Sequence, residues 1–445
     1  MNGSSPVARA HRRLVPGPRG AAQAGTWYGA LWSVVICLDY FLISSPLVFE
    51  PVFDESLRRA LLCTSIACLV SITRLQRPRL PWSVACFLGF AVASIVWSIN
   101  RAATLHFVGL YVVLGVLAVV VAANVAARVI AHGVVLGGVL VVVTSIYAYW
   151  QEMPGSDVAP GSSGVLAGVG TNRNILAYTM ILAFAFAVSF VPRRWLLRVG
   201  WSLAIATILT GLLLAESATG IASSAALAGM AIVVGSRDRL IARGRPPGWR
   251  YWVALVAILL TLVAAGLGWY EALHRDLQRD FSLTGRVQIW EAAWETSTTH
   301  ARLVGEGWGA VWPHPWRAAP ANGPFFDISQ YIGHPVTHGH NSLFDLLPEL
   351  GLVGVFLFAM IYLQSVVRGL RLRRSTATPA ARETGRVAFL GVLALALAGV
   401  TEPLSTVPLG FFVAVLLVAT VHREVVPAPE PSTPATTPDR VESAS

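Results

Sequence analysis

Long apolar runs alternate with short polar connections over most of the chain. Runs of roughly twenty residues are long enough to cross a bilayer as an α-helix, and about twelve can be distinguished. Because the runs carry few charges, the pattern predicts an all-α integral membrane protein with about twelve transmembrane helices. The predicted spans are 27–49, 57–74, 82–99, 104–124, 129–150, 174–192, 195–215, 217–236, 251–270, 343–366, 386–401 and 404–421.

Polar stretches divide the chain into five parts. Residues 1–26, rich in Arg, Pro and Gly, and residues 425–445, rich in Pro, are predicted to be disordered cytoplasmic tails. Residues 27–270 contain the first nine predicted helices and residues 342–424 contain the last three. Residues 271–341 form the largest extramembrane loop, and a loop of this length in a compact protein is usually functional.

Composition agrees with a membrane protein and limits the chemistry. The hydrophobic share is 55% and the charged share is 13%, whereas soluble domains carry about 25% charged residues. All four cysteines fall inside predicted spans, so neither an extracellular disulfide framework nor a zinc site is suggested. The outer-side acids are scattered, without the paired carboxylates that hold magnesium through phosphates.

The arginines predict the orientation of the helices. They cluster in every second loop, at 9–19, 74–79, 128, 193–198, 237–250 and 368–386. By the positive-inside rule both termini are cytoplasmic and the 271–341 loop faces outward. The same bias explains the formal net charge of +10, so no nucleic-acid partner is needed to account for it.

Arginines on the outer side run against this rule, and Arg173 and Arg286 are among those that lack an adjacent acidic residue. Arg173 and Arg286 each lie at a predicted helix start. A guanidinium group suits phosphate because it stays charged and presents a rigid fork of donors. An outward-facing cavity with these arginines is therefore predicted to hold a polyanionic head group.

The mouth of the helix predicted at 343–366 concentrates ionisable groups. The run His338-Gly339-His340-Asn341-Ser342 joins the polar loop to this helix, which carries Asp345 and Glu349. A neutral imidazole suits general-base chemistry, although helix capping or loop packing is the competing interpretation of His340. Asn341 or Ser342 is predicted to cap the helix, and Ser342 with Asp345 has capping-box spacing.

Other parts of the outer side carry further expectations. Glu349 is predicted to face away from His340 and to pair with a neighbouring helix, and Gly351 and Gly354 are predicted to make close helix contacts. Glu216 and Glu402 lie at outer helix ends and are candidates for a cavity wall. Asp39, within the first span, fits either a functional acid or a packed hydrogen bond.

The large loop is predicted to have structure of its own. Residues 285–294 show helical spacing of apolar side chains, with Thr284 as the cap. The run Gly305-Glu306-Gly307-Trp308-Gly309 is predicted to be a flexible turn, because it alternates glycine with other residues.

Several motifs together resemble those of bacterial O-antigen ligases and the related Wzy-type polysaccharide polymerases. His340-Asn341, nine residues, then Gly351-Leu352-Val353-Gly354 is similar to the family signature. The resemblance covers residues 160–405. Its other parts are Thr284-Gly285-Arg286 with Trp290, Gly305-Glu306-Gly307-Trp308-Gly309, and Glu216-Ser217-Ala218-Thr219-Gly220.

The resemblance implies a metal-independent, GT-C-like membrane glycosyltransferase that needs no cofactor. Its donor would be a glycan on a polyprenyl pyrophosphate carrier, such as undecaprenyl pyrophosphate, in the outer leaflet of the cell membrane. The acceptor would be a lipid or protein hydroxyl in a ligase and another carrier-linked glycan in a polymerase. Arginines can neutralise the pyrophosphate leaving group without a metal. Arg173 stands in an Asn-Arg-Asn context where many relatives have proline.

The resemblance and the chemistry assign roles to seven residues. His340 is the expected base and Arg286 the expected catalytic cation. The expected substrate-binding residues are Arg173, His338, Asn341, Glu216 and Glu402.

Other functions remain open at this point. Ligase and polymerase share a donor and are not separated by the sequence, with the ligase preferred. A lipid-linked oligosaccharide transporter also fits many helices, but it does not require a long one-sided loop, and the two halves show no repeat. A non-catalytic scaffold leaves the outer arginines unexplained.

Overall fold

A computed structural model describes residues 26–45, 52–153, 156, 165–170, 172–192, 194–245, 248–249, 251–253, 256–257, 284–314, 320–373, 378–404 and 406–425. The main elements in these ranges are α-helices. They are α3 (Trp27–Ser44), α4 (Val52–Val70), α5 (Trp82–Ala93), α6 (Arg101–Asn124), α7 (Ala127–Trp150), α8 (Arg173–Val188), α9 (Trp195–Leu214), α10 (Ala218–Ala242), α12 (Thr284–Thr299), α13 (Pro324–Ile332), α14 (Ser342–Leu372), α15 (Pro379–Gly399) and α16 (Pro408–Val425).

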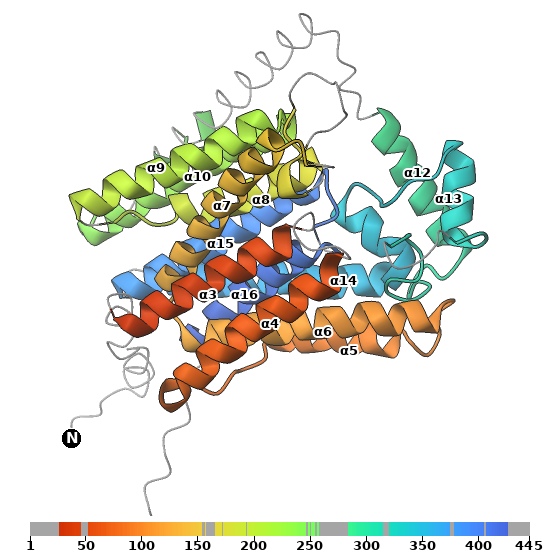
Figure 1. Cartoon of the computed structure of the whole chain (residues 1–445), viewed down its shortest axis with the longest axis horizontal. Coiled ribbons are helices and arrows are strands. Elements are labelled where there is room, and N and C mark those ends of the chain that lie inside the picture. Colours follow the sequence, from red (N-terminus) through yellow and green to blue (C-terminus); the bar gives the residue numbers. More distant parts are fainter. Residues whose placement is uncertain are drawn as a thin grey trace, which may run out of the picture.

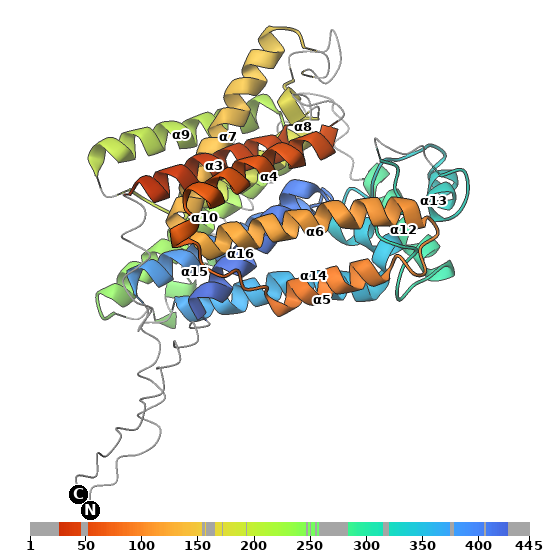
Figure 2. The same ribbon diagram turned by 60° about the horizontal axis from the view of Figure 1, so that its bottom comes forward.

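The apolar helices pack into one bundle. Helix α3 packs against α7, α6 against α16, and α14 against α15 and α16 (Figures 1 and 2). One cluster of buried hydrophobic side chains runs through these helices, with α16 buried along most of its length. The interior of the bundle is therefore mainly apolar, and a polar side chain buried there is costly unless it has a hydrogen-bond partner.

The structure confirms an all-α membrane protein, but not the predicted number of about twelve spans. In the described ranges, seven helices are long and apolar enough to cross a membrane: α3, α6, α7, α9, α10, α14 and α16. Helices α5 and α8 are apolar but shorter. The predicted spans 57–74 and 386–401 fall on α4 and α15, which carry more charged side chains. Most of the predicted span 251–270 lies outside the described residues.

Helix α14 is broken at Gly351, which has φ 61° and ψ −169°. A Cβ there would lie 2.4 Å from the Leu303 carbonyl, so only glycine fits. The predicted close contact of Gly351 with a helix is therefore wrong, because its neighbour is the loop. Backbone hydrogen bonds to that loop satisfy the groups freed by the break. They run from Leu352 N to Arg302 O (3.1 Å), Val353 N to Leu303 O (3.0 Å), Glu306 N to Pro348 O (3.1 Å) and Gly307 N to Glu349 O (2.9 Å).

Glu349 fixes the same loop from the helix side. Its side chain is 1% exposed. The carboxylate accepts hydrogen bonds from the backbone N–H groups of Gly309 (3.0 Å), Val311 (3.3 Å) and Trp312 (3.4 Å). The predicted pairing of Glu349 with a neighbouring helix is thus wrong. The segment 305–309, predicted to be a flexible turn, is instead held by these bonds and by the buried Trp308 ring.

The loop also has a small core of its own. Helices α12 and α13 lie beside one end of the bundle (Figure 1). Their buried side chains join those of the following segments in a second hydrophobic cluster: Ile289, Ala292, Ala293, Val311, Trp312, Phe325, Ile328 and Val336. The predicted helix at 285–294 is confirmed and extends to Thr299, with Thr284 as its first residue instead of its cap.

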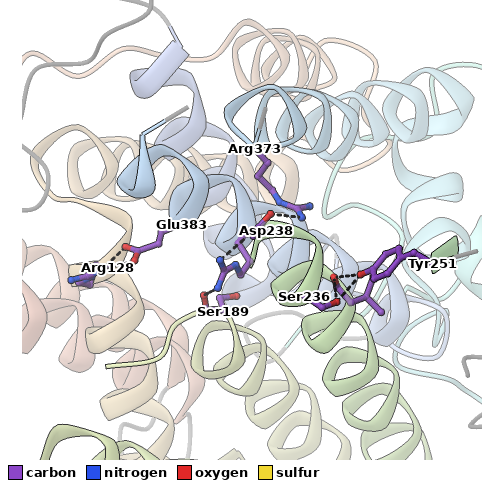
Figure 3. Close-up of polar contacts among 9 residues, drawn as sticks. Arg128, Ser189, Ser236, Asp238, Tyr251, Arg373 and Glu383 are labelled. Atoms are coloured by element: carbon purple, nitrogen blue, oxygen red, sulfur yellow. Dashed lines mark hydrogen bonds and ion pairs between the residues drawn. The ribbon is translucent and has the colours of Figure 1, made fainter. Parts of the chain in front are cut away.

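Ion pairs join the helices at the far end of α14. Asp238 of α10 accepts hydrogen bonds from Arg373 (3.1 Å) and Arg386 (2.9 Å), and Arg128 pairs with Glu383 at 2.6 Å (Figure 3). These arginines belong to loops predicted to be cytoplasmic. The same arginines therefore contribute to the positive-inside pattern and join α7, α10, α14 and α15 through ion pairs.

Candidate active site

The candidate site lies where the loop enters α14. His340 has φ 48°, a left-handed conformation that is uncommon outside glycine and is often found at functional sites. The rings of His338 and His340 are 4.0 Å apart, and the His340 N–H donates to His338 Nδ1 at 3.3 Å. His340 Nδ1 is buried and has no hydrogen-bond partner among the described residues. This nitrogen is therefore available to a substrate or a ligand.

The peptide between the two histidines is held from both sides. The Gly339 N–H donates to Asp345 Oδ1 at 2.7 Å, and Trp290 Nε1 donates to the Gly339 carbonyl at 3.0 Å. The Trp290 ring stacks on Phe344 with an interplanar angle of 10°. Asp345, 2% exposed, also accepts a hydrogen bond from Thr406. These contacts position the imidazoles before any substrate arrives.

Asn341 and Ser342 attach the start of α14 to the segment after α15. Asn341 caps α14, because its Oδ1 accepts a hydrogen bond from Leu343 N at 2.8 Å. Of the two predicted caps, Asn341 and Ser342, the structure therefore confirms Asn341. Its Nδ2 donates to the Val400 carbonyl at 2.8 Å. Ser342 Oγ donates to the Glu402 carbonyl at 3.2 Å. The predicted capping box of Ser342 with Asp345 is wrong, because the Asp345 carboxylate binds Gly339 instead.

Arg286 reaches this segment from the first turn of α12. Its guanidinium donates to the Thr401 carbonyl at 2.6 Å and to Glu402 Oε1 at 3.2 Å. Glu402 is 7% exposed, whereas about a quarter of the Arg286 side chain is accessible. Arg286 thus compensates a buried carboxylate and still presents part of its fork to an incoming anion.

Burial and charge set the protonation states of these groups. Burial, together with neighbouring His338 and Arg286, lowers the pKa of His340 to about 3. Burial, with Arg286, lowers the pKa of His338 to about 4. Burial raises the pKa of Glu402 to about 7, against the lowering effect of Arg286. Both imidazoles are therefore neutral at neutral pH, as a general base requires.

A pocket adjoins this cluster between α8, α10 and α15, and Glu402 belongs to both. Its lining includes the first turn of α10 and several residues with side-chain hydroxyls, which suits a polar ligand. Ser217 caps α10, since its Oγ accepts from Gly220 N at 3.1 Å. The pocket is lined by Asn174, Ala177, Tyr178, Ile181, Ser217, Thr219, Gly220, Ala398, Thr401 and Glu402.

Two of the predicted site residues border this pocket without lining it. Arg173 is the first residue of α8, is exposed, and makes no hydrogen bond or ion pair with the described residues. Its neighbour Asn174 lines the pocket. Glu216 is exposed, has φ 47°, and precedes the lining residue Ser217. The structure therefore gathers Arg286, His338, His340, Asn341 and Glu402, and places Arg173 and Glu216 at the edge.

Three residues of the cluster also have the donor set of a metal site. One ligand atom each from His338, His340 and Glu402 lie within 4.8 Å of one another. The sequence did not identify this group, because Glu402 is 62 positions from His340 along the chain. Asp39, in contrast, accepts a hydrogen bond from Thr64 of α4 at 2.8 Å, which is the packing alternative for that acid.

Comparisons with known proteins show what this chain is similar to. Residues 203–359 match the family model described as O-antigen ligase. This range contains Arg286 and His340, whereas Arg173 and Glu402 fall outside it. This match over residues 203–359 supports the predicted resemblance to the O-antigen ligase and Wzy-type polymerase family.

One curated relative supports the same family. The exopolysaccharide production protein ExoQ of Rhizobium meliloti (strain 1021) is 24% identical over 289 residues. The match covers 62% of this chain and 62% of the relative's length.

Proposed function

We propose that the protein is a membrane glycosyltransferase of the O-antigen ligase type. It moves a glycan from a polyprenyl pyrophosphate carrier to an acceptor hydroxyl on the outer face of the cell membrane. The observation that carries the proposal is the cluster itself: a partly exposed arginine, two neutral imidazoles and a buried carboxylate meet at the edge of a bundle. About twelve spans, with both termini inside, would place this cluster outside.

The transfer requires one bond to form and one to break. The acceptor oxygen attacks the anomeric carbon of the donor, and the bond from that carbon to the phosphate oxygen breaks. The electron pair leaves with the pyrophosphate, and the hydroxyl proton passes to His340. Arg286, together with Arg173 at the pocket edge, stabilises the developing negative charge on the leaving group.

Donor binding would also prepare His340 for its role. In the free protein, burial and nearby Arg286 depress the pKa of His340 and make it a weak base. A pyrophosphate anion beside Arg286 would offset that positive charge and raise the pKa of the imidazole. His340 therefore becomes a stronger base when the leaving group is in place.

Glu402 would support the proton transfer. Its carboxylate lies within 4.8 Å of a His340 ring nitrogen. An ionised carboxylate at this distance stabilises the imidazolium that forms when His340 takes the proton. Asn341 ties the helix start to the Val400 carbonyl, two residues before Glu402, and His338 packs against the base.

A polysaccharide polymerase is the second candidate. The name of the relative ExoQ refers to exopolysaccharide production, whereas the family model is described as O-antigen ligase. Both activities use the same donor and proton transfer. They differ in the acceptor, which the described pocket residues do not define.

Purified protein in proteoliposomes tests the proposal. A lipid-linked glycan donor is supplied only on the side predicted to be outer, with a lipid acceptor. Transfer to that acceptor supports a ligase, and a ladder of lengthened carrier-linked glycans supports a polymerase. Absence of both products, with donor crossing the bilayer, would show a transporter and refute the transferase.

A further inference from the structure

We propose that His338, His340 and Glu402 bind a divalent transition-metal ion of the zinc class, and that this ion blocks transfer. The block rests on the proposed function, whereas the metal site does not. The three ligand atoms come from the loop before α14 and the segment after α15, and all lie within 4.8 Å of one another.

The donor set favours zinc, copper or nickel over magnesium or calcium. Two imidazole nitrogens and one carboxylate oxygen form a common zinc set that leaves a fourth position open. Magnesium and calcium instead select six or more oxygen ligands. With bonds of about 2.1 Å in a tetrahedron, ligand atoms lie about 3.4 Å apart. The widest pair in the cluster, within 4.8 Å, must therefore close by up to about 1.4 Å, which side-chain rotation can supply.

The histidines can act as ligands at small cost. His340 Nδ1 is buried and has no partner among the described residues. His338 Nδ1 accepts only a long contact of 3.3 Å from the His340 N–H. That contact is lost whichever His338 nitrogen binds the ion. Binding at Nδ1 occupies the lone pair that accepts the N–H, and binding at Nε2 moves the ring proton to Nδ1, which then cannot accept. A hydrogen bond of this length contributes little.

Arg286 is the group that opposes the ion. It pairs with Glu402 Oε1 at 3.2 Å, so a metal must compete for that carboxylate. The guanidinium has a second anchor, however, because it donates to the Thr401 carbonyl at 2.6 Å. Arg286 can therefore release Glu402 without losing its place.

Occupancy would stop the proposed reaction in two ways. The ion would take up the imidazole that receives the proton, and it would hold the carboxylate that stabilises the imidazolium. Inhibition would be reversible, since removal of the ion restores both groups. Transfer itself would proceed without a metal.

The test measures zinc binding to the full-length protein in the absence of any donor. The protein is purified in detergent, stripped with EDTA and titrated calorimetrically with zinc chloride, with magnesium chloride as a second titrant. His338→Ala and Glu402→Gln each remove one ligand. His300→Ala is the matched control, since it removes a histidine of the same loop that faces Asp327 at 2.9 Å. Elution profile and thermal unfolding midpoint establish that each variant folds.

We expect one zinc ion per chain in the unaltered protein and in His300→Ala, and no magnesium binding. The dissociation constant should rise at least tenfold in the two ligand variants. Wild-type affinity in folded His338→Ala and Glu402→Gln, or no stoichiometric binding in the unaltered protein, would overturn the site.

A transfer assay decides the blocking role separately. Zinc should abolish transfer at the concentrations that fill the site, and excess EDTA should restore it. Zinc that fills the site and leaves transfer unchanged, or raises it, refutes the block. A protein that binds zinc through these residues but transfers no glycan under metal-free conditions refutes the proposed function and leaves the metal site standing.

Discussion

Replacement of Arg286 separates anion binding from a structural role. The guanidinium makes two charged hydrogen bonds, to the Thr401 carbonyl and to Glu402. If it also holds the donor pyrophosphate, Arg286→Ala removes at least one charged hydrogen bond to the donor, worth about 1.5–3 kcal/mol. Donor affinity should then fall roughly 10- to 150-fold. Arg286→Lys should also lose turnover, because a single ammonium cannot reproduce the fork.

Glu402→Gln provides the contrast within the same ion pair. The amide keeps the size of the side chain but removes the negative charge beside Arg286. Donor affinity should stay the same or rise, because the arginine no longer has a competing carboxylate, whereas turnover should fall. Affinity is measured by binding of the lipid-linked donor in detergent, and turnover by product formation. Arg286→Ala with unchanged donor affinity, or Glu402→Gln with the same affinity loss as Arg286→Ala, refutes the assignment.

Four further outcomes are expected. Asp345→Ala removes the acceptor that holds the Gly339 N–H and should lower kcat with little change in KM; an equal effect on both would point to general misfolding. Because burial raises the pKa of Glu402 to about 7, its carboxylate is ionised above that pH, and kcat/KM should fall as the pH drops through 7; the fall should be absent in Glu402→Gln. Transfer should survive excess EDTA, and loss of activity that magnesium or manganese restores would contradict this. In a cysteine-free background, Thr298→Cys and Ala380→Cys each introduce one exposed cysteine. The first should react with an impermeant thiol reagent in intact cells and the second should not, and the reverse pattern would overturn the topology.

The helices were predictable because the local sequence determines each of them. Apolar runs of span length predict helices whatever their neighbours, and in the described ranges these runs fall on helices. The helical spacing at 285–294 likewise needed no tertiary information. The number of spans was less accessible, since α4 and α15 carry charges and α5 and α8 are short.

The site was predictable only in part, because its contacts join distant segments. The His340-Asn341 motif and Arg286 stand out as polar groups at helix starts, and the structure brings them together through Val400, Thr401 and Glu402. No local pattern shows that these groups meet. The same holds for the metal-ligand set, which needs a carboxylate from the far side of α15.

Side-chain direction was the other missing information. Asp345 and Glu349 were correctly placed on the helix that follows His340, but their partners were not predicted. Both carboxylates accept backbone N–H groups of the loop, at Gly339 and at 309–312. Helical spacing gives the face of α14 on which each carboxylate lies, but it does not show that the loop packs on that face.

The central claim is that His340 takes the proton of the acceptor hydroxyl, and His340→Ala tests it most directly. The matched control is His334→Ala, which removes an exposed histidine from the same loop. Both variants are purified with the unaltered protein, matched for elution profile and thermal unfolding midpoint, and given a saturating lipid-linked donor and acceptor.

The account predicts that His340→Ala binds the donor but transfers about a hundred- to ten-thousand-fold more slowly, as expected for loss of a general base. His334→Ala should transfer at the normal rate. Near-normal transfer by folded His340→Ala would contradict the account and leave Glu402 as the next base to test.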